Sequence, residues 1–263
     1  MKKTIIASLL IGAFAAPVMA QTAAPAAAEA TPAPASPFTG NVTLATEYIY
    51  RGITQSNRKP AIQGGFDYAH SSGAYVGVWA SSISWLSDIP GGISAPIEID
   101  VYGGFKNTFA EDFSYDVGVL TYNYPGTYPA GFTKPETQEV YGSLGWKWLS
   151  AKYSYAFSKN IFGWTGTNGE KTRGSDYLEL NGNFDLGNGW GVLGHIGHQK
   201  IKNFSDASYT DYKVGVTKDV GLGVIGLSYW DTDAKGSAGQ PYRNAFNKDM
   251  GKGAVLLTFT KTL

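Results

Sequence analysis

Charged side chains recur at every second position of short, otherwise apolar segments of this sequence. In residues 97–106, Glu98 and Asp100 alternate with Ile97, Ile99 and Val101. Neighbouring side chains of a β-strand point to opposite faces, so such a strand has one charged face and one apolar face. Fixed charges around an aqueous lumen attract counter-ions and repel co-ions. The sequence therefore predicts a set of inward, pore-lining charges: Glu47, Arg51, Asp67, Glu98, Asp100, Lys106, Asp116, Glu139, Lys147, Lys152, Glu179 and Lys213.

Seven of these side chains are acidic and five are basic, which predicts a mild preference for cations. A second interpretation is that the charges pair across strands and fill the interior. A barrel of about eight strands is filled by side chains, whereas one of about sixteen holds an aqueous channel, so an intermediate size permits both. We expect a narrow conducting pore, with a filled barrel as the alternative.

Two loop motifs resemble ligand sites but lack the required context. Residues 221–226 match the spacing G-x-G-x-x-G, which binds dinucleotides only where the turn leaves a strand and opens a helix. Here the motif runs into a strand. Residues 231–236 resemble the start of a calcium loop, but Lys235 and Tyr242 occupy ligand positions, which leaves at most a loose divalent contact. We therefore expect neither a cofactor nor a resident metal.

The three histidines, His70, His195 and His198, offer little for catalysis. His195 and His198 are three residues apart on one expected strand, so they face opposite sides and cannot share a metal. A barrel that hydrolyses lipid needs a histidine beside a serine near one rim. His198 could pair with a serine, but the sequence shows no further partner. We expect an interfacial histidine and no enzymatic activity, with a lipid hydrolase as the alternative.

The charges are positioned by about twelve strands, which predicts an all-β, transmembrane antiparallel β-barrel. A lipid-facing Lys or Arg at the bilayer midplane costs about 2–4 kcal/mol, so the charged faces are expected to point inward. In the first strand this places Val42, Leu44, Tyr48 and Tyr50 toward lipid. Residues 75–81 and 222–230 are apolar on both faces, which indicates contact with a loop folded inward, or a different register. The expected strands are 39–51, 61–69, 74–83, 97–107, 113–123, 137–147, 149–158, 176–186, 189–200, 208–218, 222–231 and 252–263.

The connections between these strands are expected to alternate between long loops and tight turns. A soluble sandwich explains the alternating side chains equally well, but it has no reason to keep long loops on one rim. An outer-membrane barrel does keep them there. The long connections are expected at 52–60, 84–96, 124–136, 159–175, 201–207 and 232–251.

The N-terminus predicts export. Residues 1–20 begin with Met1-Lys2-Lys3, continue with an apolar stretch and end with Val18-Met19-Ala20, which is typical of a signal peptide cleaved after Ala20. Residues 21–37 are almost wholly Ala, Pro and Thr, and we expect a disordered periplasmic tail. No later run approaches about 18 apolar residues, so no transmembrane helix is expected. Residues 38–263 then form the outer-membrane barrel.

Composition and the C-terminus narrow the partners. The net charge is near zero without a basic domain, which argues against nucleic acid. The 34 glycines and 14% aromatic residues suit a barrel with tight bends and aromatic membrane girdles. The last segment, 253–263, ends on Leu263 and resembles the assembly signal of outer-membrane proteins, which usually ends in Phe or Trp. The expected partners are the barrel-assembly machinery, outer-membrane lipid and lipopolysaccharide, and small polar solutes or ions.

Four segments resemble a known family. Residues 38–56 are similar to the opening strand of the TorF-type porin family of proteobacterial outer-membrane proteins, and residues 61–68, 77–82 and 98–104 continue the match in order. The resemblance covers the N-terminal third well, and the remainder by pattern and length. It implies an outer-membrane barrel with channel activity and no defined solute. We therefore expect a porin-like channel for passive diffusion; the alternatives are the lipid hydrolase and a closed structural or surface-interaction barrel.

Overall fold

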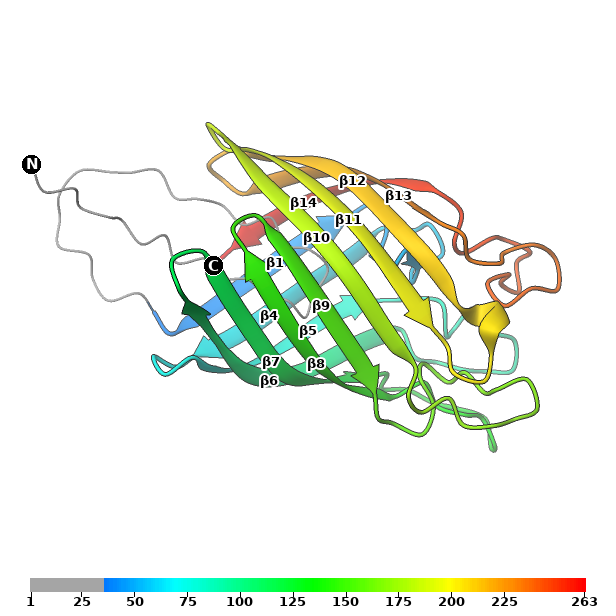
Figure 1. The fold of residues 1–263 in the computed structure, drawn as a ribbon. Helices are drawn as coiled ribbons and strands as arrows, with labels where there is room; N and C mark the ends of the chain where they lie inside the picture. Colours follow the sequence, from blue (N-terminus) through cyan, green and yellow to red (C-terminus); the bar gives the residue numbers. More distant parts are fainter. Residues whose placement is uncertain (1–35) are drawn as a thin grey trace, which may run out of the picture.

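The computed structural model describes residues 36–263. The predicted signal peptide and all but the last two residues of the predicted tail lie outside the described residues. Twelve antiparallel strands form the wall of a closed barrel, as predicted (Figure 1). They are β1 (Phe38–Ala45), β4 (Ala61–Ala69), β5 (Ala74–Ser82), β6 (Ile97–Phe109), β7 (Phe113–Asn123), β8 (Thr137–Trp146), β9 (Leu149–Ala156), β10 (Asp176–Gly187), β11 (Trp190–Lys200), β12 (Tyr209–Asp219), β13 (Val224–Thr232) and β14 (Ala254–Thr262).

The first and last strands close the barrel. β1 pairs with β4 on one side and with β14 on the other, where Asn41 lies opposite Thr262 and Ala45 opposite Thr258. Tight turns and the C-terminus lie at one rim and the long connections at the other (Figure 1), which confirms the predicted alternation. A short 3-10 helix, η1 (Ser205–Ala207), lies in one long loop. Within residues 36–263, no helix is long and apolar enough to span a membrane.

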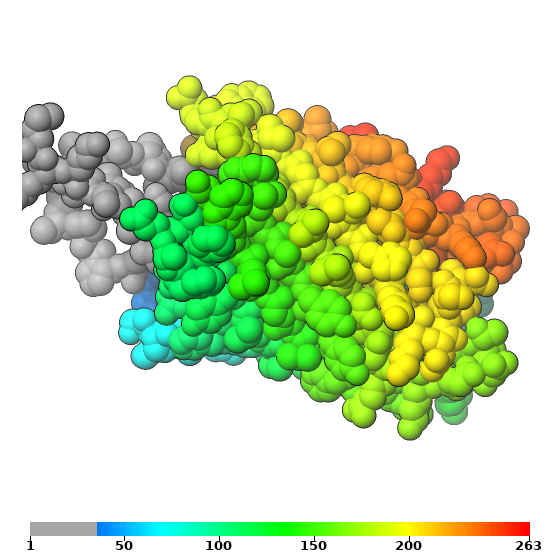
Figure 2. Space-filling model, in the orientation of Figure 1, coloured from blue at the N-terminus to red at the C-terminus, as the bar shows by residue number. Residues whose placement is uncertain are grey.

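The outer face of the barrel carries exposed apolar side chains along its strands, and Figure 2 shows the side formed by β8–β13. Aliphatic side chains such as Leu180 and Val214 are exposed along the middle of the strands. Aromatic side chains cluster beside the tight turns, where the rings of Phe109 and Phe113 lie 5.6 Å apart. The other exposed aromatics at this rim include Phe38, Phe105, Trp146, Trp148, Phe184 and Trp190.

The first predicted strand, 39–51, is too long. The wall strand β1 ends at Ala45, and residues 46–60, which we call the inward segment, turn into the barrel. This segment forms a small hairpin of β2 (Ile49–Tyr50) and β3 (Ile53–Thr54). Tyr48 was expected to face lipid but is only 1% exposed inside the barrel, and Tyr50 also lies inside, partly buried.

The inward segment explains the first of the two strands that are apolar on both faces. On β5, the inner Trp79 packs edge-to-face against Tyr48 of the inward segment, with ring centroids 5.4 Å apart. The interpretation that a loop folds inward onto this strand is therefore correct. On β13, the inner Trp230 instead faces Lys213 and His195 on the neighbouring wall.

Candidate functional site in the barrel interior

The inward segment is fixed to the wall by backbone hydrogen bonds. The Thr46 N–H donates to the Leu257 carbonyl at 3.0 Å, and the Thr54 N–H donates to the Met250 carbonyl at 3.0 Å. The Gln55 carbonyl accepts from the amides of Ser84 and Trp85, at 2.9 and 3.1 Å. These bonds reach two regions of the barrel far apart in sequence, residues 84–85 and residues 250–257. The segment is therefore a fixed part of the interior.

An ion pair holds the tip of the hairpin. The Arg51 guanidinium donates to both carboxylate oxygens of Glu139 on β8, at 3.0 and 2.8 Å, and to the Gln199 side-chain oxygen at 2.7 Å. Its planar group also lies 4.2 Å from the ring centroid of Tyr177. A two-point Arg–carboxylate contact fixes geometry as well as charge. Arg51 thereby joins the inward segment to β8, β10 and β11.

Gly52, next to Arg51 at the tip of the hairpin, packs against the opposite wall of the barrel. Arg51 and Gly52 both have positive φ, 45° and 76°, which is the backbone of a tight two-residue hairpin turn. A Cβ at Gly52 would lie 2.3 Å from Thr232 Cγ2 and 2.6 Å from Asp211 Cβ. Only glycine fits this contact with β12 and β13. The hairpin therefore spans the interior from β8 to β12–β13.

Most of the predicted inward carboxylates are engaged by tyrosine hydroxyls. Glu98 accepts from Tyr48 at 2.8 Å and also from Tyr124. Burial, and then the neighbouring carboxylate of Glu98, raise the pKa of Tyr124 well above its ordinary value, so this phenol stays a neutral donor. The carboxylates of Asp67 and Asp116 each accept from a tyrosine at 2.6 Å. The β4–β8 side of the interior is thus filled by aromatic rings and by acids that accept from tyrosines. Asp100 on β6 differs, because its Oδ1 is buried without a partner in the described part of the chain.

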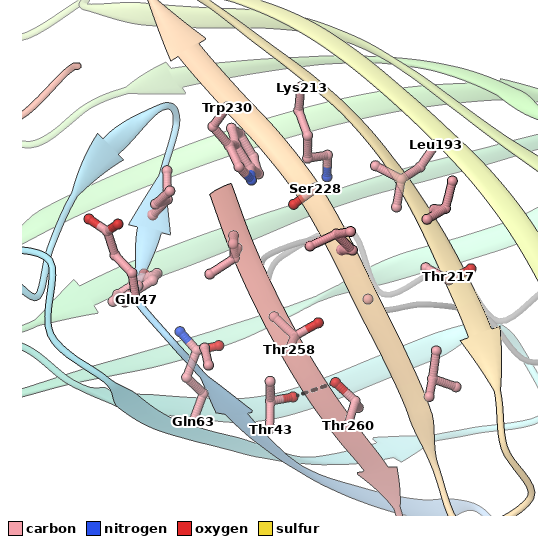
Figure 3. Close-up of a pocket in the computed structure, with 18 residues that line it drawn as sticks. Thr43, Glu47, Gln63, Leu193, Lys213, Thr217, Ser228, Trp230, Thr258 and Thr260 are labelled. Carbon is pink, nitrogen blue, oxygen red and sulfur yellow. Dashed lines mark hydrogen bonds between the residues drawn. The ribbon is translucent and has the colours of Figure 1, made fainter. Parts of the chain in front are cut away.

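The opposite side of the interior holds a cavity of about 60 Å³ (Figure 3). By the same kind of measure a single water needs roughly 10–15 Å³, so the cavity has room for a few waters. Its polar lining consists mainly of hydroxyls, an amide and two charged side chains. These are Thr43, Gln63, Thr217, Ser228, Thr258, Thr260, Glu47 and Lys213.

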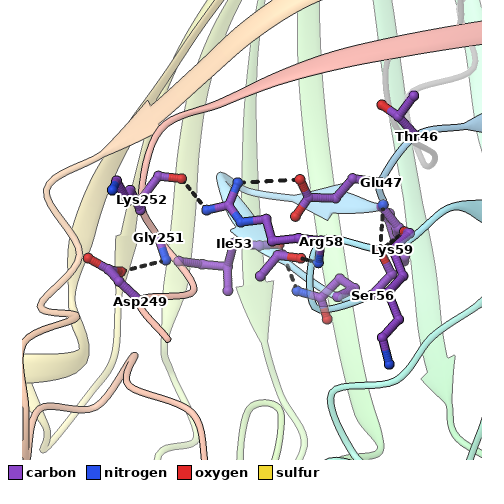
Figure 4. A network of polar contacts seen from close by, with 12 residues as sticks. Thr46, Glu47, Ile53, Ser56, Arg58, Lys59, Asp249, Gly251 and Lys252 are labelled. Atoms are coloured by element: carbon purple, nitrogen blue, oxygen red, sulfur yellow. Dashed lines mark hydrogen bonds and ion pairs between the residues drawn. The ribbon is translucent and has the colours of Figure 1, made fainter. Parts of the chain in front are cut away.

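Glu47 sits at the boundary between the inward segment and this cavity. Its Oε2 accepts from Arg58 at 3.3 Å, and Arg58 also donates to the Lys252 carbonyl (Figure 4). Its Oε1 is buried and has no partner in the described part of the chain. The charge of Glu47 is therefore balanced by one arginine, while one of its oxygens remains free to accept a hydrogen bond.

Three neighbouring wall strands, β10, β11 and β12, contribute a row of hydrogen-bonded polar side chains inside the barrel, which we call the polar row. Asp211 on β12 accepts from Tyr177 at 2.9 Å and lies 2.9 Å from His195 Nε2, while His195 Nδ1 lies 2.7 Å from the Asn181 side-chain oxygen. His198 faces outward and contacts Thr210 at 3.0 Å. The prediction that the two histidines face opposite sides is confirmed.

Lys147 is the exception among the twelve predicted inward charges. Strand β8 ends at Trp146, and Lys147 adopts a positive φ of 52° in the turn before β9. Its side chain is 49% exposed and pairs with Asp112 at 3.5 Å, across to the neighbouring turn. The prediction extended the strand one residue too far. The other eleven side chains lie inside the barrel, with Asp67, Lys106 and Glu179 only partly buried.

The sequence interpretation missed the neutral members of the site. Tyr48, Tyr124 and Tyr177 hold acids, and Trp230 lies against Lys213, but an inventory of charged residues does not include them. The sequence did contain one signal of these neutral residues, because residues 75–81 and 222–230 are apolar on both faces. It marked the strands whose inner tryptophans, Trp79 and Trp230, contact other interior groups.

Comparison with known proteins gives a family and a fold. A model of the Gcw_chp family, described as a bacterial protein of unknown function, matches residues 29–263. The structure is similar to that of the NanC porin (TM-score 0.53, 10% identity, covering 85% of this chain and 98% of that one). It is also similar to the KdgM porin, with a TM-score of 0.51 and 8% identity, covering 85% of this chain and 97% of that one. The KdgM porin in complex with disordered oligogalacturonate gives a TM-score of 0.50 with the same identity and coverage. No curated protein matches the sequence.

Proposed function

The chain belongs to the Gcw_chp family of bacterial proteins, and we propose that its barrel is an outer-membrane channel through which small polar solutes or ions diffuse passively. The apolar outer face supports a membrane location, because exposed apolar surface of this extent indicates contact with lipid or another apolar partner. Aromatic side chains beside the tight turns match the girdle at a membrane interface. Transport then depends on the interior alone.

The observation that carries the proposal is the hydroxyl-lined cavity beside the fixed inward segment. The segment and the tyrosine-capped acids fill the β4–β8 side, so the path for solutes follows β1 and β11–β14. Hydroxyl and amide groups replace part of a solute's hydration without binding it too tightly to leave. The channel is accordingly narrow, and the inward segment forms its constriction.

The narrower expectations belong to the same proposal. Export would follow cleavage after Ala20, leave residues 21–37 as a periplasmic tail and require the barrel-assembly machinery and outer-membrane lipid. The assignment to TorF-type porins rests on the sequence segments quoted above. A lipid hydrolase is less well supported, because the polar contact of the outward His198 is Thr210, not a serine.

Planar-bilayer recording of the refolded barrel tests the proposal. Folding is checked first by gel mobility, since a closed barrel without strand edges migrates faster before boiling. We expect small, discrete conductance steps. Thr258→Trp, which fills the cavity, should reduce them, whereas Leu257→Trp on the outward face of the same strand should not. A folded barrel without conductance would instead favour the closed structural barrel.

A further inference from the structure

Two hydrogen-bond donors at one end of the cavity have no acceptor among the residues the structure describes. The Trp230 indole Nε1 is buried and without a partner. The Lys213 ammonium, on a residue only 4% exposed, contacts the Trp230 ring at 4.6 Å, and no carboxylate of residues 36–263 lies within ion-pair distance of it. Lys213 and Trp230 are direct cross-strand neighbours on β12 and β13. A buried indole N–H without an acceptor, and an ammonium largely withdrawn from water without one, are costly unless something else satisfies them.

The nearest acids are held by other groups. Asp211 accepts from Tyr177 and contacts His195, both at 2.9 Å. Glu179 accepts from Asn181 at 2.9 Å. Both carboxylates act on the Lys213 charge only through space, and Lys213 is one of the residues that line the cavity. The ammonium therefore faces the cavity.

The lining of the cavity defines what would fit beside these donors. Figure 3 shows the ends of Lys213, Trp230 and Ser228 close together, while Glu47 lies at the opposite side of the group drawn. Two donors at one end favour an anionic oxygen pair. The free Oε1 of Glu47, together with the hydroxyls of Thr217 and Thr258, favours a ligand that also carries hydrogen-bond donors.

We propose that Lys213 and Trp230 form a carboxylate-binding site in the lumen, specific for small hydroxy acids. The carboxylate accepts from the ammonium and the indole N–H, and the ligand hydroxyl meets the Glu47 end of the cavity. This inference rests on the proposed channel function and names its solute class. A volume of about 60 Å³ suits an acid of a few heavy atoms.

Lactate, propionate and glycerol are suitable probes, because they share a three-carbon frame and differ in charge and hydroxyl groups. Reversal potentials in potassium lactate and potassium propionate gradients give the permeability of each anion relative to potassium, and liposome swelling gives glycerol entry. For Lys213→Gln we expect lactate permeability to fall about tenfold. This factor corresponds to the lower end of the free energy that a hydrogen bond to a charged group contributes. Trp230→Phe keeps the ring but removes the N–H, so the loss should be smaller. Glycerol entry should not change, and wild type should favour lactate over propionate.

Lys106→Gln is the matched control, because it removes another inner lysine whose ammonium lies over Tyr75, away from the cavity.

A second readout does not need conduction: lactate should raise the temperature of the heat-modifiable transition of wild type but not of Lys213→Gln. A barrel that does not conduct but shows this Lys213-dependent stabilisation would overturn the channel and keep the site. Equal lactate permeability and equal stabilisation in wild type and Lys213→Gln would overturn the site and keep any channel that conducts.

Discussion

Arg51 and Glu139 form a two-point ion pair inside the barrel, with their side chains only 7% and 1% exposed. Arg51 belongs to the hairpin of the inward segment and Glu139 to the wall strand β8, 88 residues later in the chain. A buried pair is weak support for net stability, but it fixes one geometry, because neither charge has an equally good partner elsewhere. The pair therefore sets how far the hairpin reaches across the lumen.

Arg51→Gln should release the hairpin and destabilise the barrel. Removing one member of a buried ion pair leaves the other charge uncompensated, which costs about 3–5 kcal/mol. The temperature of the heat-modifiable transition should fall, and the single-channel conductance should rise because the constriction is no longer held against β8. Gel mobility against temperature and bilayer recording measure the two effects.

The double variant Arg51→Gln/Glu139→Gln is the control for the unpaired charge. It leaves no buried charge at this contact, so much of the stability should return while the conductance stays high. A conductance unchanged in both variants would show that the backbone bonds of the inward segment hold the constriction without the ion pair.

Gly52→Ala should move the hairpin tip for a steric reason. Its Cβ would overlap Thr232 and Asp211, and the left-handed backbone adds a strain of about 1–2 kcal/mol. Gly239→Ala is the matched control, since Gly239 has nearly the same φ, 77°, but nothing within 4 Å of the added Cβ. We expect a larger loss of thermal stability for Gly52→Ala, and altered conductance only there. Equal effects would mean that backbone strain alone matters.

The wall could be predicted from sequence because its signal is local. In residues 97–106 each side chain's facing follows from its position in the alternation, and the structure buries Glu98 and Asp100 while exposing Ile97 and Val101. The alternation of long and short connections likewise predicted which loops lie at each rim of the barrel. Each of these features needs only neighbouring residues to specify it.

The interior could not be predicted in this way because its contacts are not local. Residues 39–51 alternate like one strand, and the departure at Ala45 depends on bonds from Gln55 to Ser84 and from Thr54 to Met250. The fit of Gly52 against β12 and β13 depends on residues about 160 to 180 positions later. The predicted inward facing of Lys147 was wrong for a simpler reason: the strand ends one residue earlier than predicted.

An arginine on β12 should be tolerated on the inner face and not on the outer one. Val214 lies in the middle of the strand and is 62% exposed, so Val214→Arg places a charge toward lipid at a cost of about 2–4 kcal/mol if it lies at the midplane. Thr217 lines the cavity on the same strand. We expect Val214→Arg to reduce the folded, heat-modifiable fraction in the membrane, and Thr217→Arg to fold but conduct less. Similar folded fractions for both variants would contradict the assigned facing of β12.

Of the seven acids and five bases in the predicted set, Glu47 and Lys213 are the ones that line the cavity. Glu98 and Asp100 are buried behind the tyrosines of the filled side, whereas Glu47 borders the cavity. Glu47→Gln should therefore shift the reversal potential in a potassium chloride gradient toward anions, because Arg58 then loses its balancing carboxylate. Glu98→Gln/Asp100→Asn removes twice as much negative charge but should shift it less. A larger shift for the double variant would place the selective charges on the β6 side and restore the simple tally as the better guide.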